Sequence, residues 1–222
     1  PSVVPTSFSA LPPPWLAAAR AAMVEPPRKT RLPLWVQGKA VGSLVEHFLL
    51  ETGISGRLAK DCLLTKQERS GTAVWLLDSD AQDATAAVNL LAQALREAGR
   101  SGPWRNEQLA VHATDGQQVG TVERGAVRVL GITTLAVHLV GVAPDGQLWV
   151  QQRAANKANY PLHWDTLMGC MVSAADSLEQ ALARETWEEA GLQTAELEAL
   201  RWGGVLHFRH PDVDGSDDLA YM

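Results

Sequence analysis

Cysteine is scarce in this sequence of 222 residues, which contains only Cys62 and Cys170. Two cysteines so far apart do not have the spacing of metal ligands. Reduced thiols are the simplest interpretation, and we therefore expect a cytoplasmic protein.

Long apolar runs and an excess of positive charge are also missing. No apolar run approaches the ~20 residues that cross a bilayer, so we expect no membrane partner. The N-terminus shows neither the basic start nor the continuous apolar core of a signal peptide. Lysine and arginine number 19 against 25 acidic residues, a net charge of −6. Without a basic stripe to neutralise phosphates, general nucleic-acid binding is not expected.

A chain of 222 residues is long enough to form one large domain or two modest domains, each with a hydrophobic core. We predict a Pro-rich lead-in with a short helix over residues 1–29. A small α/β domain is expected over 30–127, and a second domain over 128–222. We see no internal repeats.

Hydrophobic periodicity and turn residues predict the elements of both domains. In the first domain we expect strands over 32–36 and 73–77, helices over 41–50 and 84–98, and a hairpin pairing 108–113 with 119–122. In the second we expect a hairpin pairing 135–143 with 147–153, a loop over 159–164, a helix over 177–191 and a strand over 200–207. One hairpin, one helix and one strand form a poor closed layer, so part of this domain is expected to be missing at the C-terminus.

The helix over 177–191 carries the main chemical signal. Ser177 can cap it, with Gln180 in the reciprocal position of a capping box. Glu185, Glu188 and Glu189 project from adjoining parts of one face because residues three and four apart are neighbours on a helix. Like charges at this spacing repel, which indicates a positive partner such as Mg²⁺ or Mn²⁺. The plain alternative is a solvated acidic face.

A hairpin, a loop and a helix ending in R-E-x-x-E-E-x-G-L resemble the Nudix hydrolase family. The family signature is G-x5-E-x7-R-E-U-x-E-E-x-G-U, where U is a bulky aliphatic residue. Thr186 occupies the first aliphatic slot, and the signature residues in register are Arg184, Glu185, Glu188, Glu189, Gly191 and Leu192. The upstream half departs from the pattern, since Cys170 and Asp176 stand where the signature has Gly and Glu.

The resemblance implies an α/β (α+β) fold, namely a Nudix α/β/α sandwich with a mixed sheet preceded by a smaller α/β domain. It implies an enzyme that cleaves a diphosphate bond in a small-molecule organic pyrophosphate, with Mg²⁺ or Mn²⁺ as cofactor. The implied metal ligands are Glu185, Glu188, Glu189 and the carbonyl of Gly169. Glu188 and Glu189 are the implied catalytic residues, with Arg184 orienting a carboxylate.

The stretch VQQRAANKANYPLHWDTLMGC, preceded by AVHLVGV, is similar to a two-domain Nudix subgroup associated with thiamin diphosphate metabolism in fungi and plants. Thiamin diphosphate or a nucleoside diphosphate derivative is therefore an expected substrate. Arg153 and Lys157 are candidates to bind diphosphate oxygens, and Tyr160 and Trp164 to stack on a substrate ring. Surface solvation of the first pair and core packing of the second are the plainer alternatives.

Two further functions stay open at this point. An isopentenyl-diphosphate-isomerase-like enzyme shares the Nudix scaffold, and Cys170 lies near the place of its catalytic cysteine. A Nudix scaffold without catalysis could sense a ligand or dock a partner, given the weakened upstream half of the signature. A homodimer is an additional expectation.

Overall fold

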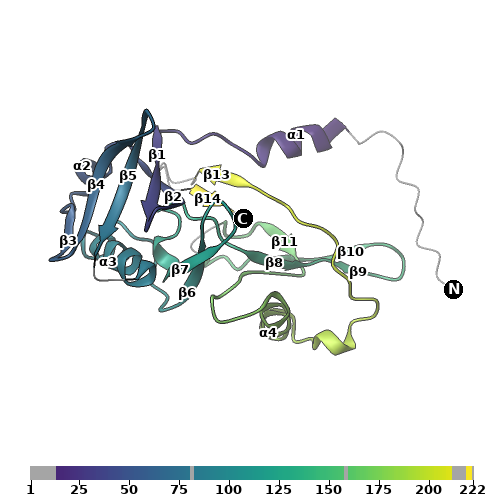
Figure 1. Ribbon diagram of the computed structural model, residues 1–222. Helices are drawn as coiled ribbons and strands as arrows, with labels where there is room; N and C mark the ends of the chain where they lie inside the picture. The colour runs from purple at the N-terminus through teal and green to yellow at the C-terminus, as the bar shows by residue number, and fades with distance from the viewer. Residues whose placement is uncertain (1–13, 81–82, 158–159, 212–218, 222) are drawn as a thin grey trace.

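The computed structural model describes residues 14–80, 83–157, 160–211 and 219–221, which form a mixed α+β fold (Figure 1). Helix α1 (Pro14–Ala22) leads into a five-stranded sheet made of β1 (Arg31–Val36), β2 (Lys39–Val45), β3 (Arg57–Ala59), β4 (Cys62–Arg69) and β5 (Thr72–Ser79). The strand order is β2-β1-β5-β4-β3, with β1 and β5 parallel and the other pairs antiparallel. The mixed sheet agrees with the expected fold class.

The core of this first unit lies between the sheet and helix α3 (Ala84–Glu97). Asp83 caps α3 by accepting from the Ala86 amide, and Ala87, Val88, Leu91 and Leu95 are buried along one face. This spacing is that of an amphipathic helix, and the helix predicted over 84–98 is confirmed. The hairpin of β6 (Gln108–His112) and β7 (Gln118–Glu123) is confirmed as well. The 3₁₀ turn η1 (Arg124–Ala126) follows it.

The helix predicted over 41–50 is wrong. Residues 39–45 form β2, and only the short helix α2 (Phe48–Thr52) follows. Val41 and Leu44 are buried against the core as strand residues, and β1 supplies the hydrogen-bonding partner. A Cβ added to Gly42 would lie 2.4 Å from the Leu130 carbonyl oxygen, so the backbones approach closely there. Tertiary pairing therefore overrides a local pattern that suited either element.

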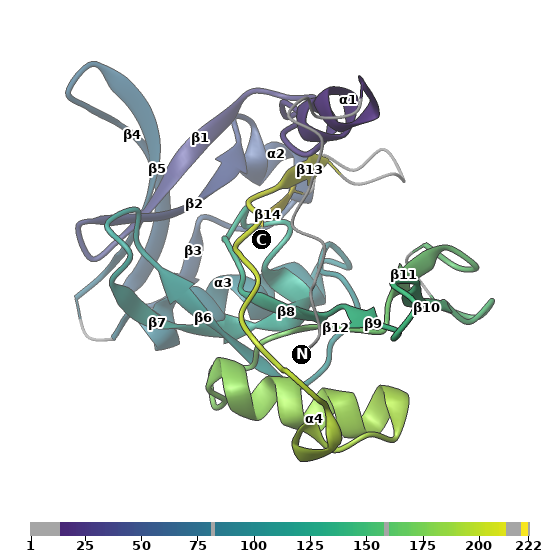
Figure 2. The same cartoon turned by 90° about the vertical axis from the view of Figure 1, so that its right-hand side faces the viewer.

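The second unit contains short strands and one long helix. The strands are β8 (Ala136–Leu139), β9 (Gly141–Val142), β10 (Leu148–Gln152), β11 (Trp164–Thr166) and β12 (Met168–Met171). Strand β12 pairs with β8, while β10 pairs with β9 and β11. The predicted hairpin is confirmed through the β9–β10 pairing, whereas β11 and β12 fall where a loop leading into the helix was expected. Helix α4 (Leu178–Ala190) packs on β8 and β12 (Figure 2).

Two separate groups of buried side chains support these units. The larger group draws on residues 32–132, and the smaller consists of Val137, Leu139, Met168, Val172, Ala181 and Leu182. Met171 of β12 packs against the larger group, so β12 joins the two units. No helix of the described residues is long and apolar enough to cross a membrane.

The strand predicted over 200–207 is also wrong. After the turn η2 (Thr194–Glu196) the chain has no regular structure until β13 (Arg209–Pro211), which pairs with β14 (Leu219–Tyr221). Trp202, Val205 and Leu206 are exposed there. A strand needs a neighbour to share its hydrogen bonds, and residues 200–207 pair with no strand in the described part of the chain.

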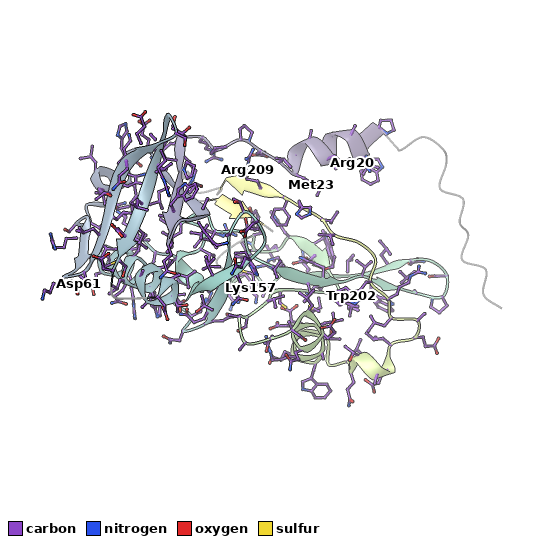
Figure 3. The ribbon with its side chains drawn as sticks, in the orientation of Figure 1. Arg20, Met23, Asp61, Lys157, Trp202 and Arg209 are labelled. Carbon is purple, nitrogen blue, oxygen red and sulfur yellow. The ribbon has the colours of Figure 1, made fainter. Side chains whose placement is uncertain are left out.

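The segment that follows helix α1 forms backbone hydrogen bonds with the C-terminal stretch. Arg209 donates its amide to the Met23 carbonyl at 2.7 Å, and Glu25 donates its amide to the Arg209 carbonyl at 3.0 Å (Figure 3). Helix α1 confirms the short helix predicted in the lead-in, and it buries no residue.

Candidate functional site

Helix α4 has the ends that its sequence predicts. The Ser177 hydroxyl accepts the Gln180 amide at 3.2 Å, and the Gln180 side chain accepts the Ser177 amide at 2.8 Å. The pair satisfies two of the amides that the first turn of a helix leaves open. Gly191 ends the helix in the left-handed region with φ +66°. Both ends of the acidic segment are thus set by local chemistry.

One face of α4 is buried and the acidic face is not. Ala181, Leu182 and Thr186 turn inward, toward β8 and β12. Trp187, an aromatic residue within the same helix, is 59% exposed and does not pack against the sheet. The reason is rotational: Trp187 lies about 100° around the helix from the buried Thr186.

Arg184 supplies positive charge to the acidic face. Its guanidinium donates to Asp176 at 2.7 Å and to Glu185, and it lies 3.8 Å from Glu188. The hydrogen bond to Asp176 raises the pKa of Arg184, and the carboxylate of Glu185 adds to the rise. The like-charge repulsion expected among the glutamates is therefore offset at least in part within the helix itself. Asp176, despite its shorter side chain, reaches the arginine of the signature.

Glu189 connects the helix to the neighbouring strand. Its carboxylate accepts the Gly169 amide at 3.4 Å and the Gln151 side-chain amide at 3.3 Å. A Cβ added to Gly169 would lie 2.7 Å from the ring of the exposed His138, so the backbone of β12 and this side chain lie close together. Gln151 of β10 was not among the predicted site residues, and only the pairing register reveals which face of β10 looks toward α4.

Cys170 lies within the field of the same acids. Burial raises its pKa to about 12, and the carboxylates of Glu185 and then Glu189 add to the rise. The thiol therefore stays protonated near neutral pH. Glu185 and Glu189 therefore lie near enough to Cys170, the residue at the signature glycine position, to act on its thiol electrostatically.

The loop between β10 and β11 holds the predicted substrate-binding residues. Arg153 pairs with Asp165 at 3.3 Å, and the Tyr160 and His163 rings stack with centroids 5.4 Å apart. Lys157 donates its backbone amide to Ala154 within the same loop. These contacts tie Arg153 to β11 and hold described residues of the loop near one another.

Trp164 is separated from Glu189 by the sheet. In the β10–β11 register Gln151 pairs with Asp165 and Gln152 pairs with Trp164. Side chains alternate across a strand, so Gln151 and Asp165 share the face toward α4, and Trp164 takes the opposite one. Trp164 is 70% exposed and does not fill the core.

Comparison with known proteins agrees with this geometry. Residues 133–221 match the NUDIX domain. An uncharacterized Nudix hydrolase of Pseudomonas aeruginosa is 33% identical over 93 residues, covering 42% of this chain and 53% of the relative. An uncharacterized Nudix hydrolase of Streptomyces coelicolor is 33% identical over 73 residues, covering 33% of this chain and 40% of the relative. The chain thus spans about half, or less, of the length of these relatives.

These matches show that residues 133–221 are similar to the Nudix domain and to Nudix hydrolases. They say nothing of a thiamin-related subgroup. The matched range begins at residue 133, directly after the larger core ends at Ile132. The first unit lies outside the Nudix match.

The donor chemistry of helix α4 suits a divalent cation. Carboxylates are the hard oxygen ligands that Mg²⁺ and Mn²⁺ prefer, and Glu189 already touches β12 beside Gly169. Across residues 14–80, 83–157, 160–211 and 219–221, however, no three His, Cys, Asp or Glu side chains are grouped to hold a metal. Glu185 turns to Arg184, and Glu189 turns to the amides of Gly169 and Gln151. The ligand set therefore stays a prediction that the donor chemistry supports.

Proposed function

We propose that the protein hydrolyses a diphosphate bond in a small organic pyrophosphate, with Mg²⁺ or Mn²⁺ bound at the acidic face of α4. The observation that carries this proposal is the placement of the signature acids. Glu189 reaches the backbone of Gly169, Glu185 is held by Arg184, and Glu188 lies one turn from Glu185 on the same helix.

The proposed ligands are the carboxylates of Glu185, Glu188 and Glu189 together with the carbonyl of Gly169. A divalent cation bound there would stabilise charge on the phosphoryl oxygens and lower the pKa of a bound water. Glu188 and Glu189 are the proposed catalytic carboxylates. The side chain of Glu188 is 56% exposed, whereas that of the ligand Glu185 is 16% exposed, so Glu188 is the more accessible of those two carboxylates.

Arg184 acts as a positioning residue in this proposal. It holds Glu185 directly and is itself held by Asp176. Because charge-assisted hydrogen bonds are directional, this chain of contacts limits the orientations that the Glu185 carboxylate can adopt.

Arg153 and Lys157 are the proposed groups for the diphosphate oxygens. Arg153 lies one residue beyond β10, on the strand that also carries Gln151, the contact of Glu189. Tyr160, stacked with His163, is the proposed aromatic contact for the substrate. Trp164, on the other face of the sheet, would reach a substrate only at the rim of the loop.

Replacement of Glu188 by Gln tests the proposal. The change keeps the size of the side chain and removes its charge, so we expect Mg²⁺-dependent turnover to fall by roughly 100-fold or more. Glu179→Gln is the matched control, because Glu179 is an exposed acid in the first turn of the same helix and outside the signature. Circular dichroism checks that both variants fold. Wild-type turnover in Glu188→Gln would refute the proposal.

A panel of diphosphates identifies the substrate. Thiamin diphosphate and its oxidised derivatives come first by analogy with the resembling subgroup, followed by nucleoside diphosphate derivatives, each in Mg²⁺ and in Mn²⁺. Release of a monophosphate product supports hydrolysis. Formation of an allylic isomer without phosphate release would favour the isomerase alternative. Calorimetric binding without any product would favour a ligand-sensing module. Light scattering of the purified chain tests the expected homodimer.

A further inference from the structure

The hairpin β6–β7 of the first unit touches the loop that precedes the Nudix helix. The Ala174 amide donates to the Gln108 carbonyl at 2.8 Å, across the free edge of β6. Gln108 is held firmly in turn, because its side chain exchanges hydrogen bonds with Asn89 of α3 and accepts the Thr121 hydroxyl. A part of the first unit that is held by several hydrogen bonds thus borders the loop over residues 172–177, which leads into α4.

Packing strengthens this joint on both sides of the hydrogen bond. Met171, three residues before Ala174, packs against the core of the first unit. Beyond Ala174, the hairpin and the loop line one shared hollow, to which the hairpin contributes Ala110, His112 and Gln118, and the loop contributes Ser173, Ala174 and Asp176. The loop therefore adjoins the hairpin at this hydrogen bond and around the hollow.

A short series of contacts leads from this joint to the acidic face. Ala174 is the second residue of a turn that the Asp176 amide closes on the Ser173 carbonyl at 3.1 Å. The Asp176 carboxylate then accepts from Arg184 at 2.7 Å, and Arg184 donates to Glu185. Any shift of the turn moves the carboxylate that holds Arg184.

We propose that the β6–β7 hairpin positions the loop over residues 172–177, which leads into α4, through the hydrogen bond from the Ala174 amide to the Gln108 carbonyl. The first unit is then a working part of the hydrolase site: it sets the place of Asp176, and Asp176 sets the orientation of Arg184 and Glu185. Gln108 is the positioning residue, acting through its backbone carbonyl. The part of this inference that concerns metal affinity rests on the proposed function.

Ala174→Pro removes the amide at this joint. Proline suits the second position of such a turn, so the turn itself is kept while the donor is lost. Loss of one hydrogen bond corresponds to a change of roughly 3- to 10-fold in a local equilibrium. We expect hydrogen exchange at the Asp176 and Ser177 amides to accelerate by that factor, and the Kd for Mn²⁺ alone to rise by a similar factor.

Thr114→Pro is a closely matched control. Thr114 is also the second residue of a turn, which the Gly116 amide closes on the Ala113 carbonyl, and its amide also donates to a neighbouring strand, at the Ala40 carbonyl. That hydrogen bond lies wholly within the first unit. We expect faster exchange only around that turn, with the Mn²⁺ affinity within about twofold of wild type.

Ester substitution provides a second variant in case the proline ring disturbs folding. Replacing Ala174 by its α-hydroxy acid analogue removes the same donor without a ring. It also makes the Ser173 carbonyl, which accepts the Asp176 amide, a weaker acceptor. The measurements for this variant are therefore exchange at the Ser177 amide and the Kd for Mn²⁺, for which the same changes are expected. Unchanged exchange and Mn²⁺ affinity in a folded Ala174 variant would overturn the inference, as would an equal loss of Mn²⁺ affinity in Thr114→Pro. Failure of the wild-type protein to bind Mn²⁺ would overturn the proposed function instead, and the exchange measurements would then decide the positioning role.

Discussion

Thr186 occupies an aliphatic slot of the Nudix signature, and its hydroxyl is a defect in the core. The residue is fully buried, and its Oγ1 has no hydrogen-bond partner among the residues that the structure describes. A buried hydroxyl without a partner costs roughly 1–3 kcal/mol. Thr186→Val replaces the hydroxyl with a methyl group of nearly the same size, and the two residues have similar helix propensities. We therefore expect the free energy of unfolding to rise by about 1–2 kcal/mol.

Urea unfolding followed by far-ultraviolet circular dichroism measures the change, and hydrogen exchange of the α4 amides assigns it to the Nudix domain. For a chain of this size, each kcal/mol shifts the thermal midpoint by about 2–4 °C. Turnover and metal affinity should not change, since Thr186 faces the core and not the acidic face. Thr186→Ser is the control, because it keeps the hydroxyl, loses the methyl group and should destabilise the domain. A Thr186→Val protein no more stable than wild type would show that the hydroxyl has a partner after all.

Two further substitutions test stability elsewhere in the chain. Gly191→Ala should lower the free energy of unfolding by about 1 kcal/mol, because Gly191 ends α4 with φ +66°, and Gly191→Asn should lower it less; equal losses in thermal melts would contradict this reasoning. Glu123 is a buried carboxylate that accepts the amides of Arg105, Glu107 and Gly125. Glu123→Ala should lower the free energy of unfolding by about 2–3 kcal/mol in urea titrations, and Glu123→Gln by less, since one acceptor remains; a neutral Glu123→Ala would show that solvent satisfies these amides.

Features that depend on neighbours in the chain were predictable from the sequence. The capping box of Ser177 and Gln180, the end of α4 at Gly191 and the placement of three glutamates on one helical side all follow from local spacing. The helix over 84–98 and the hairpin over 108–122 belong to the same class. In each case the residues that mark the ends and turns lie within a few positions of one another, so the positions of these elements can be predicted before the tertiary packing that stabilises them is known.

Features that depend on a distant partner were not predictable. The pattern Leu44, Val45, Phe48 and Leu49 suits a helix, yet β1 and the Leu130 backbone make β2 the stable choice. Strand β4 was not predicted because its second half consists of four polar residues, Lys66 to Arg69, and the sequence there lacks the apolar run that indicates a strand. Residues 200–207 have the composition of a strand and no strand beside them.

The candidate site divides in the same way. The sequence alone predicted which residues are candidates for the chemistry, since Arg184, Glu185, Glu188 and Glu189 match the signature in register on one helix. Only the tertiary structure decided what those residues touch: Arg184 with Asp176, Glu189 with Gly169 and Gln151, and the loop with the hairpin of the first unit. Spacing along a helix follows from its 3.6-residue period, whereas contact between segments depends on how sheets pair and pack, which no single segment encodes.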